Sequence, residues 1–147
     1  MLRITAKKSM ISNCKLWRNI LRVLVIDDQE KILEYVEDIL IDISPDIEVV
    51  SRTSWVSVEQ VLEKNAQFDL ILLDVVMPEI DGIKIHQMLK KDYQLGERVV
   101  FMTGASLIGV ILERPYIRKP FSEKDIFDLV MEYCPEDEIE HLISNGG

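Results

Sequence analysis

Two aliphatic segments of this chain end abruptly in acidic residues. Leu70–Leu73 is followed at once by Asp74, and Val23–Ile26 is followed by the pair Asp27 and Asp28. Short aliphatic runs of this kind are typical of buried strands. A carboxylate buried alone is strongly unfavourable unless another group compensates its charge, and clustered carboxylates raise one another's pKa values. We therefore expect these acids to share a cationic partner.

A divalent metal ion would relieve the repulsion among the three acids. Mg²⁺ typically takes one or two carboxylates, backbone carbonyls and water as ligands, and Mn²⁺ accepts the same oxygen donors. Asp74 would then stay ionised, and an ionised carboxylate can attack phosphorus to give an aspartyl phosphate. The metal ion and an ammonium group, for which Lys119 is the candidate, would neutralise charge on the transferring phosphoryl oxygens.

The elements that must position these residues follow a regular alternation. Aliphatic and β-branched runs predict strands at 22–27, 47–53, 68–74, 98–103 and 115–118. Apolar residues at helical spacing predict helices at 29–43, 57–65, 82–93 and 122–134. Ser122 is the expected N-cap of the last helix, whose first turn is acidic. The apolar segment 105–113 is short and ambiguous.

The alternation predicts a single α/β domain. Strands separated by helices form parallel sheets with right-handed crossovers, and helices cover both faces of such a doubly wound sheet. Ligands bind beyond the carboxyl ends of the strands in these sheets, where the strand order reverses. Asp27, Asp28, Asp74, Thr103 and Lys119 all follow or end predicted strands, so we expect them to converge at one edge of the sheet.

The charge distribution argues against nucleic acid as a partner. Six of the 17 basic residues lie in 1–22, which contains no acidic residue. The remaining chain has 11 basic residues against 26 acidic ones, a net charge of −15. A body this acidic repels nucleic acid.

Composition also bears on the compartment. No apolar run approaches the roughly 20 residues that cross a bilayer, and residues 1–21 lack the apolar core of a secretory signal. Cys14 and Cys134 lie far apart and form neither a disulfide framework nor a C-x-x-C pair. These features predict a cytoplasmic protein with no membrane span.

Four motifs carry a resemblance to a known family. The stretches VLVIDDQE, LILLDVVMPEIDG, VVFMTGAS and YIRKPF resemble, in order and spacing, the signatures of response regulator receiver domains of two-component signal transduction, including chemotaxis regulators. The resemblance covers Arg22 to Tyr133 and implies a flavodoxin-like, five-stranded parallel sheet of order 2-1-3-4-5. It divides the chain into a basic N-terminal extension (1–21), a receiver domain (22–133) and an acidic C-terminal tail (134–147).

The resemblance implies a role for each acid. Asp74 would be the phosphoacceptor. Asp28 and Asp74 would bind Mg²⁺ directly, Asp27 would bind it through water, and the backbone carbonyl of Val76 would be a third protein ligand. Met77-Pro78 and Asp81-Gly82 are expected to shape the loop that presents Asp74.

The resemblance also implies a conformational change in response to phosphorylation. Lys119, which precedes a proline that is typically cis in this family, would pair with the phosphoryl oxygens. Thr103 would donate a hydrogen bond to the phosphoryl group, and Tyr116 would turn inward as Thr103 moves. The phosphoryl donor would be a phosphohistidine on a histidine kinase or phosphotransfer protein. The signal would pass by contact to a downstream protein, without enzyme turnover by this chain.

The chain departs from the family pattern between its last two strands. Lys119 follows Thr103 by 16 positions, fewer than the family usually has. The fourth helix, between these strands, is therefore expected to be short, which puts dimerisation through this surface in doubt. The short spacing is also similar to that of receivers attached to hybrid sensor kinases. Val76 and Ala105, at positions that tune hydrolysis, are apolar and predict a long-lived phospho-Asp74.

Other interpretations stay open. Residues 1–21 have Met10, Cys14, Trp17 and Leu21 at helical spacing, which is consistent with an amphipathic helix. This segment either docks on the acidic domain, contacts a partner or a membrane surface, or is a disordered leader. The chain is either a stand-alone regulator, with only about 14 residues after its last helix, or a receiver excised from a longer chain. Rival functions are an aspartyl-nucleophile hydrolase, which typically has an acid where Val76 stands, and a phosphorylation-independent adaptor.

Overall fold

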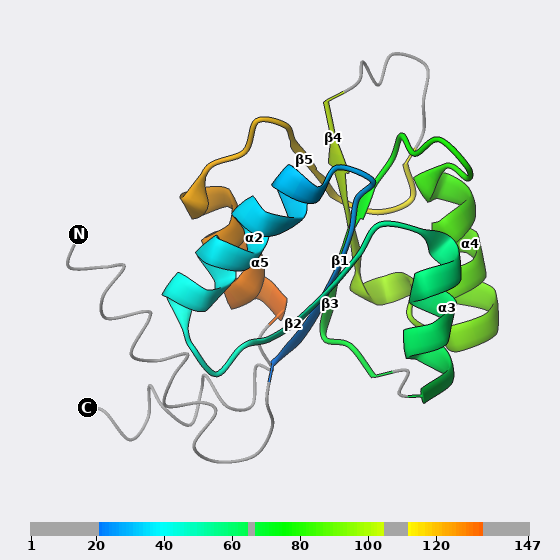
Figure 1. The fold of residues 1–147 in the computed structure, drawn as a ribbon, viewed down its shortest axis with the longest axis horizontal. Helices are drawn as coiled ribbons and strands as arrows, with labels where there is room; N and C mark the ends of the chain where they lie inside the picture. The colour runs from blue at the N-terminus through cyan, green and yellow to red at the C-terminus, as the bar shows by residue number, and fades with distance from the viewer. Residues whose placement is uncertain (1–20, 65–66, 105–111, 134–147) are drawn as a thin grey trace.

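The computed structural model describes residues 21–64, 67–104 and 112–133, which form one sheet with helices on both sides (Figure 1). The strands are β1 (Arg22–Ile26), β2 (Glu48–Arg52), β3 (Leu70–Asp74), β4 (Val99–Thr103) and β5 (Tyr116–Arg118). The helices are α2 (Glu30–Ile43), α3 (Trp55–Lys64), α4 (Gly82–Tyr93) and α5 (Glu123–Tyr133), with a short 3-10 helix, η1 (Gly96–Arg98).

The sheet is parallel throughout and has the order β2-β1-β3-β4-β5. This confirms the predicted doubly wound sheet and its strand order. The direction of strand placement reverses after β1, since β2 lies on one side of it and β3 on the other. The carboxyl ends of β1 and β3 therefore flank the point where ligands bind in such sheets.

Two helices cover each face of the sheet. Helices α2 and α5 lie on one side and α3 and α4 on the other (Figure 1). Successive strand residues point to opposite faces, so Val23 and Val25 join the α2–α5 core while Leu24 and Ile26 join the α3–α4 core. Because both faces are buried, the central strands are aliphatic throughout rather than alternating.

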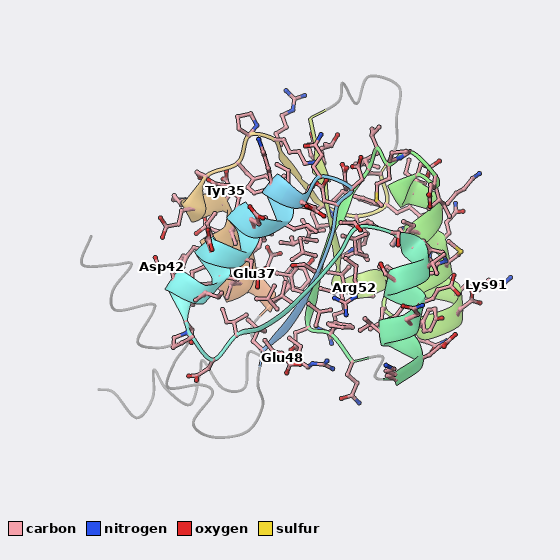
Figure 2. All side chains as sticks on the ribbon, viewed as in Figure 1. Tyr35, Glu37, Asp42, Glu48, Arg52 and Lys91 are labelled. Carbon is pink, nitrogen blue, oxygen red and sulfur yellow. The ribbon has the colours of Figure 1, made fainter. Side chains whose placement is uncertain are left out.

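The outer surfaces of the helices are polar. Figure 2 shows charged side chains such as Asp42 and Lys91 directed outward, whereas side chains crowd the space between helices and sheet. Within the described residues, no helix has both the length and the apolar character needed to cross a membrane.

Two helix starts illustrate how local sequence sets the boundaries. Ser122 and Asp125 form a reciprocal cap, with the Asp125 N–H donating to Ser122 Oγ at 3.2 Å and the Ser122 N–H donating to Asp125 Oδ2 at 2.8 Å. The predicted N-cap is confirmed. Helix α3 begins at Trp55, two residues earlier than predicted, because Ser54 accepts hydrogen bonds from the N–H groups of Ser57 and Val58.

The other predicted element bounds differ little from the observed ones, and some predictions concern residues that the structure does not describe. Each strand is one or two residues shorter than predicted, and α4 has the predicted bounds. The amphipathic helix expected in 1–21 lies outside the described residues, which begin at Leu21. The acidic tail 134–147 lies outside them as well. The same holds for most of the shortened fourth helix, which would fall in 105–111.

Candidate functional site

Asp27 and Asp74 lie side by side at the carboxyl edge of the sheet. Asp74 ends β3 and Asp27 follows β1, and these neighbouring strands pair Ile26 with Leu73 in register. Both carboxylates are buried, with Asp74 only 4% exposed. The Asp27 side chain accepts a hydrogen bond from the N–H of Gln29 at 2.9 Å, which fixes its orientation at the start of α2.

Asp28 completes a trio of acids. One carboxylate oxygen from each of Asp27, Asp28 and Asp74 lies within 4.8 Å of the others, and Asp28 is the least buried of the three. Hard oxygen donors at this spacing suit a divalent cation such as Mg²⁺ or Mn²⁺. The structure thus brings together the three acids that the sequence singled out.

Lys119 reaches the same place from the other end of the chain. Its Nζ lies 2.5 Å from Asp27 Oδ2 and 3.5 Å from Asp74 Oδ1. The lysine follows β5, and its N–H donates to the carbonyl of Thr103 at 2.8 Å, which ties it to the end of β4. The Lys119–Pro120 peptide bond is cis. One ammonium group among three carboxylates leaves this pocket short of positive charge.

The environment of Asp74 shifts the pKa of its carboxyl group. Burial, followed by the charge of Asp27, raises the pKa of Asp74 to about 6. The charge of Lys119 and the N–H of Val76, which donates to Asp74 Oδ1 at 3.4 Å, act in the opposite direction. A second cation in the pocket would lower the pKa and keep the carboxylate ionised. The donor set and the charge balance both fit a bound divalent ion.

The acids open onto a cavity of about 440 Å³, which we call the acid hollow. It is lined by Asp28, Gln29, Asp74, Val76, Met77, Pro78, Gly104 and Lys119. Val76 stands at its rim with 61% of its surface exposed. A group the size of a phosphate can therefore approach Asp74 from solvent.

The loop after β3 is held against the acceptor by Gly82. The Gly82 N–H donates to the carbonyl of Val75 at 2.8 Å, and a Cβ at this position would lie 2.1 Å from the carbonyl oxygen of Asp74. Only glycine fits this close approach. Asp81 caps α4 by accepting from the Lys84 N–H at 2.9 Å. The structural role expected for Asp81-Gly82 is thus observed.

Thr103 and Tyr116 do not line the acid hollow. Thr103 ends β4 and is fully buried. Tyr116 begins β5, pairs in register with Phe101, and is 47% exposed. Tyr116 therefore occupies an outward position, and the inward movement expected of it remains a prediction.

Arg114 is a residue whose role the sequence did not reveal. Its guanidinium donates to the carbonyls of Val99 (3.0 Å) and Glu97 (2.8 Å) and to the Tyr133 hydroxyl (2.7 Å). It thereby anchors the segment before β5 to the start of β4 and the end of α5. Its partners are 15 to 19 positions away along the chain, so no local pattern marks it.

Comparisons with known proteins agree with this geometry. The family model described as response regulator receiver domain matches residues 23–131. The chain is 31% identical over 111 residues to the heme response regulator HssR of Staphylococcus haemolyticus, an alignment that covers 71% of this chain and 47% of that protein. It is 29% identical over 125 residues to the signal transduction histidine-protein kinase BarA of Escherichia coli, covering 77% of this chain and 13% of that protein.

A solved structure shows the same fold. The crystal structure of a response regulator receiver domain protein from Clostridium thermocellum has a TM-score of 0.69 to this chain at 23% identity, covering 81% of this chain and 98% of that one. The chain spans less than half the length of both curated relatives described above.

Proposed function

The chain belongs to the response regulator receiver domain family of two-component signalling, and from this premise we propose that Asp74 accepts a phosphoryl group from a partner's phosphohistidine. The donor would be a histidine kinase or a histidine phosphotransfer protein. The observation that carries the proposal is the placement of Asp74 at the end of β3, with the Lys119 ammonium 3.5 Å away and two further carboxylates beside it.

The transfer needs an ionised carboxylate and a path to it. An oxygen of Asp74 attacks the phosphorus, a new P–O bond forms, and the P–N bond to the donor imidazole breaks. The electron pair of that bond stays on the imidazole nitrogen, which takes up a proton. Above about pH 6 Asp74 is mostly ionised even without a metal ion, and the acid hollow gives the phosphorus access to it.

The acids would hold the metal ion that this transfer requires. Asp28 and Asp74 would bind Mg²⁺, or Mn²⁺, directly; Asp27 would act through water and Val76 through its backbone carbonyl. When bound, the ion supplies positive charge that offsets the charge of the transferring phosphoryl oxygens. Lys119 would leave its contact with Asp27 and pair with one of these oxygens.

The change in charge at Asp74 would shift a conformational equilibrium. We expect the Thr103 hydroxyl to donate to the phosphoryl group and the Tyr116 ring to move inward from its exposed position. Phosphorylation would thus favour one of two packings near β4 and β5. The altered surface would contact a downstream protein, so the chain would act as a cytoplasmic signalling module rather than as an enzyme.

The domain could belong to a response regulator or, as the second candidate, to a longer hybrid sensor kinase. The similarity to BarA, which covers 13% of that histidine kinase, favours it, whereas the similarity to HssR favours a response regulator. In either setting we propose residues 22–133 as the receiver domain, with the same chemistry at Asp74.

Phosphorylation by a small donor tests the proposal. The full chain is incubated with Mg²⁺ and acetyl phosphate, and its intact mass is measured. We expect the gain of one phosphoryl group in the wild type and in Asp92→Asn, an exposed acid on α4, and no gain in Asp74→Asn. Folded protein that gains no mass would favour the adaptor interpretation, and turnover of a phosphate ester would favour a hydrolase.

A further inference from the structure

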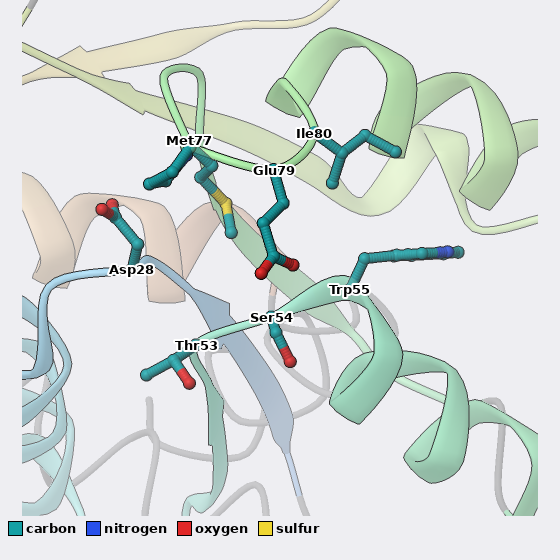
Figure 3. Close-up of a pocket in the computed structure, with 8 residues that line it drawn as sticks. Asp28, Thr53, Ser54, Trp55, Met77, Glu79 and Ile80 are labelled. Atoms are coloured by element: carbon teal, nitrogen blue, oxygen red, sulfur yellow. The ribbon is translucent and has the colours of Figure 1, made fainter.

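A second hollow lies next to the acid hollow. Apart from Asp28, none of the residues that line it has a role in the proposed phosphoryl transfer. It has a volume of about 290 Å³ and lies between the β2–α3 turn and the β3–α4 loop (Figure 3). We call it the Trp55 hollow. It is lined by Asp28, Thr53, Ser54, Trp55, Met77, Pro78, Glu79 and Ile80.

The lining combines an aromatic ring with carboxylates and hydroxyls. Figure 3 shows the Trp55 side chain along one side and the Glu79 side chain extending from the β3–α4 loop toward Ser54. Ile80 and Met77 contribute apolar surface, and Asp28 closes the end nearest the acid trio. Aromatic faces and carboxylates both attract cations.

The Trp55 hollow has no cation of its own. Its lining includes no lysine or arginine, and among the described residues no ion pair or hydrogen bond to the Glu79 side chain is formed. Glu79 is exposed, so it is free to receive a partner without any change in the core. The hollow therefore presents negative charge beside an aromatic ring, which is the complement of a guanidinium group.

The Trp55 hollow lies where a protein that binds at the acid hollow could supply the guanidinium group. The two hollows share Asp28, Met77 and Pro78, so they are adjacent on the molecular surface. A protein that brings a phosphohistidine to Asp74 must lie over the acid hollow, and the adjacent hollow is then within reach of its side chains. A small phosphoryl donor would fill the acid hollow alone.

We propose that the Trp55 hollow binds an arginine side chain of the protein that donates the phosphoryl group. The guanidinium would stack on the Trp55 ring and donate to the Glu79 carboxylate, and its aliphatic stem would contact Ile80 and Met77. Arginine fits better than lysine because its planar group can stack and donate at the same time. This inference rests on the proposed function, since it identifies a feature of the donor protein.

The test uses a single arginine residue as the probe. The ¹⁵N-labelled full chain, saturated with Mg²⁺ so that the acid trio is occupied, is titrated with N-acetyl-arginine amide and followed by NMR. We expect saturable shifts at the Trp55 indole N–H and at the backbone of residues 53–55 and 77–80. Trp55→Phe identifies the indole signal. N-acetyl-citrulline amide, which has the same shape without the charge, should bind about tenfold more weakly.

Two variants separate the Trp55 hollow from general attraction to an acidic protein. Glu79→Gln should weaken arginine binding about tenfold, whereas Glu63→Gln, an exposed acid at the far end of α3, should leave it unchanged. Equal binding of citrulline, equal binding by Glu79→Gln, or shifts centred on Asp27 and Lys119 would overturn the proposal.

The same wild-type sample is then treated with acetyl phosphate. If Asp74 is modified but arginine does not bind at the Trp55 hollow, the inference fails and the proposed function stands. If arginine binds there but Asp74 is not modified, the proposed function fails, and with it the assignment of the cation to a phosphoryl donor.

Discussion

The Lys119 ammonium lies closer to Asp27 than to Asp74, at 2.5 Å against 3.5 Å. The lysine is therefore held by the neighbour of the proposed acceptor rather than by the acceptor itself. Asp74 and Lys119 both line the acid hollow, so the ammonium is within reach of a group bound there. Burial, followed by repulsion from Asp27, raises the pKa of Asp74, and Lys119 offsets these effects only in part.

The uncompensated charge of Asp74 should make the metal-free protein less stable at neutral pH than at mildly acidic pH. A carboxyl whose folded pKa is about 6, above the ordinary 3.8, binds more protons in the folded than in the unfolded state between these values. Its cost to stability is fully present above about pH 6 and disappears as the pH falls toward 3.8. Asp74→Asn removes that cost.

We therefore expect Asp74→Asn to raise the free energy of unfolding at about pH 7.5 by on the order of 1 to 2 kcal/mol, a value reduced for screening by solvent. The gain should shrink as the pH is lowered from 6 toward 4. Urea unfolding in the presence of a chelator measures it, with Asp92→Asn as the control. A gain that is independent of pH would contradict the assigned titration.

Binding of Mg²⁺ should reverse the same destabilisation. An ion that binds only the folded state raises the unfolding temperature in proportion to the logarithm of its concentration above the dissociation constant. Asp28→Asn should weaken Mg²⁺ binding about tenfold or more, because a direct carboxylate ligand is lost. Thermal unfolding over a range of Mg²⁺ concentrations measures this. A midpoint that responds equally to Mg²⁺ in the wild type and in Asp28→Asn would place the metal elsewhere.

Gly82→Ala should strongly destabilise the fold. The added Cβ would lie 2.1 Å from the Asp74 carbonyl oxygen, so the loop that presents Asp74 would have to move. We expect a loss of about 2 kcal/mol or more, as for overpacked sites. Gly104→Ala is the matched control at the other side of the acid hollow, because its Cβ would meet nothing nearer than 3.6 Å. Similar losses in both variants, measured by urea unfolding, would refute the packing argument.

Val76→Asn should shorten the life of phospho-Asp74. Val76 stands at the rim of the acid hollow and cannot hydrogen-bond a water molecule that attacks phosphorus, whereas an amide can. Its exposure of 61% means that the substitution leaves the core intact. Decay of the phosphorylated chain after removal of acetyl phosphate is compared with that of Val56→Asn, an equally exposed valine on α3. A wild-type lifetime of seconds, or one unaffected by Val76→Asn, would count against a slow hydrolysis controlled at this position.

Much of the fold was predictable because its signals are local. Aliphatic runs and helical spacing identified every described strand and α-helix, and the capping residue Ser122 was visible in the sequence. The alternation of strands and helices then brought Asp27, Asp28, Asp74 and Lys119 to one edge, where the structure places them.

The rest depends on contacts between distant segments. The distance from Gly82 to the Asp74 carbonyl, the anchoring by Arg114 and the Trp55 hollow all arise from how loops pack after the sheet has formed. No periodicity encodes such contacts. The early start of α3 was missed for a simpler reason, because Ser54 and Ser57 are both capable N-caps and only the folded turn selects Ser54.

The most direct measurement is to locate the phosphoryl group itself. After treatment with acetyl phosphate and Mg²⁺, borohydride reduces an aspartyl phosphate to homoserine, and peptide mass spectrometry then identifies the modified position. Homoserine should appear at position 74 alone and only when the donor, the metal ion and Lys119 are all present. Homoserine at another acid, or none in a folded chain, would contradict the account.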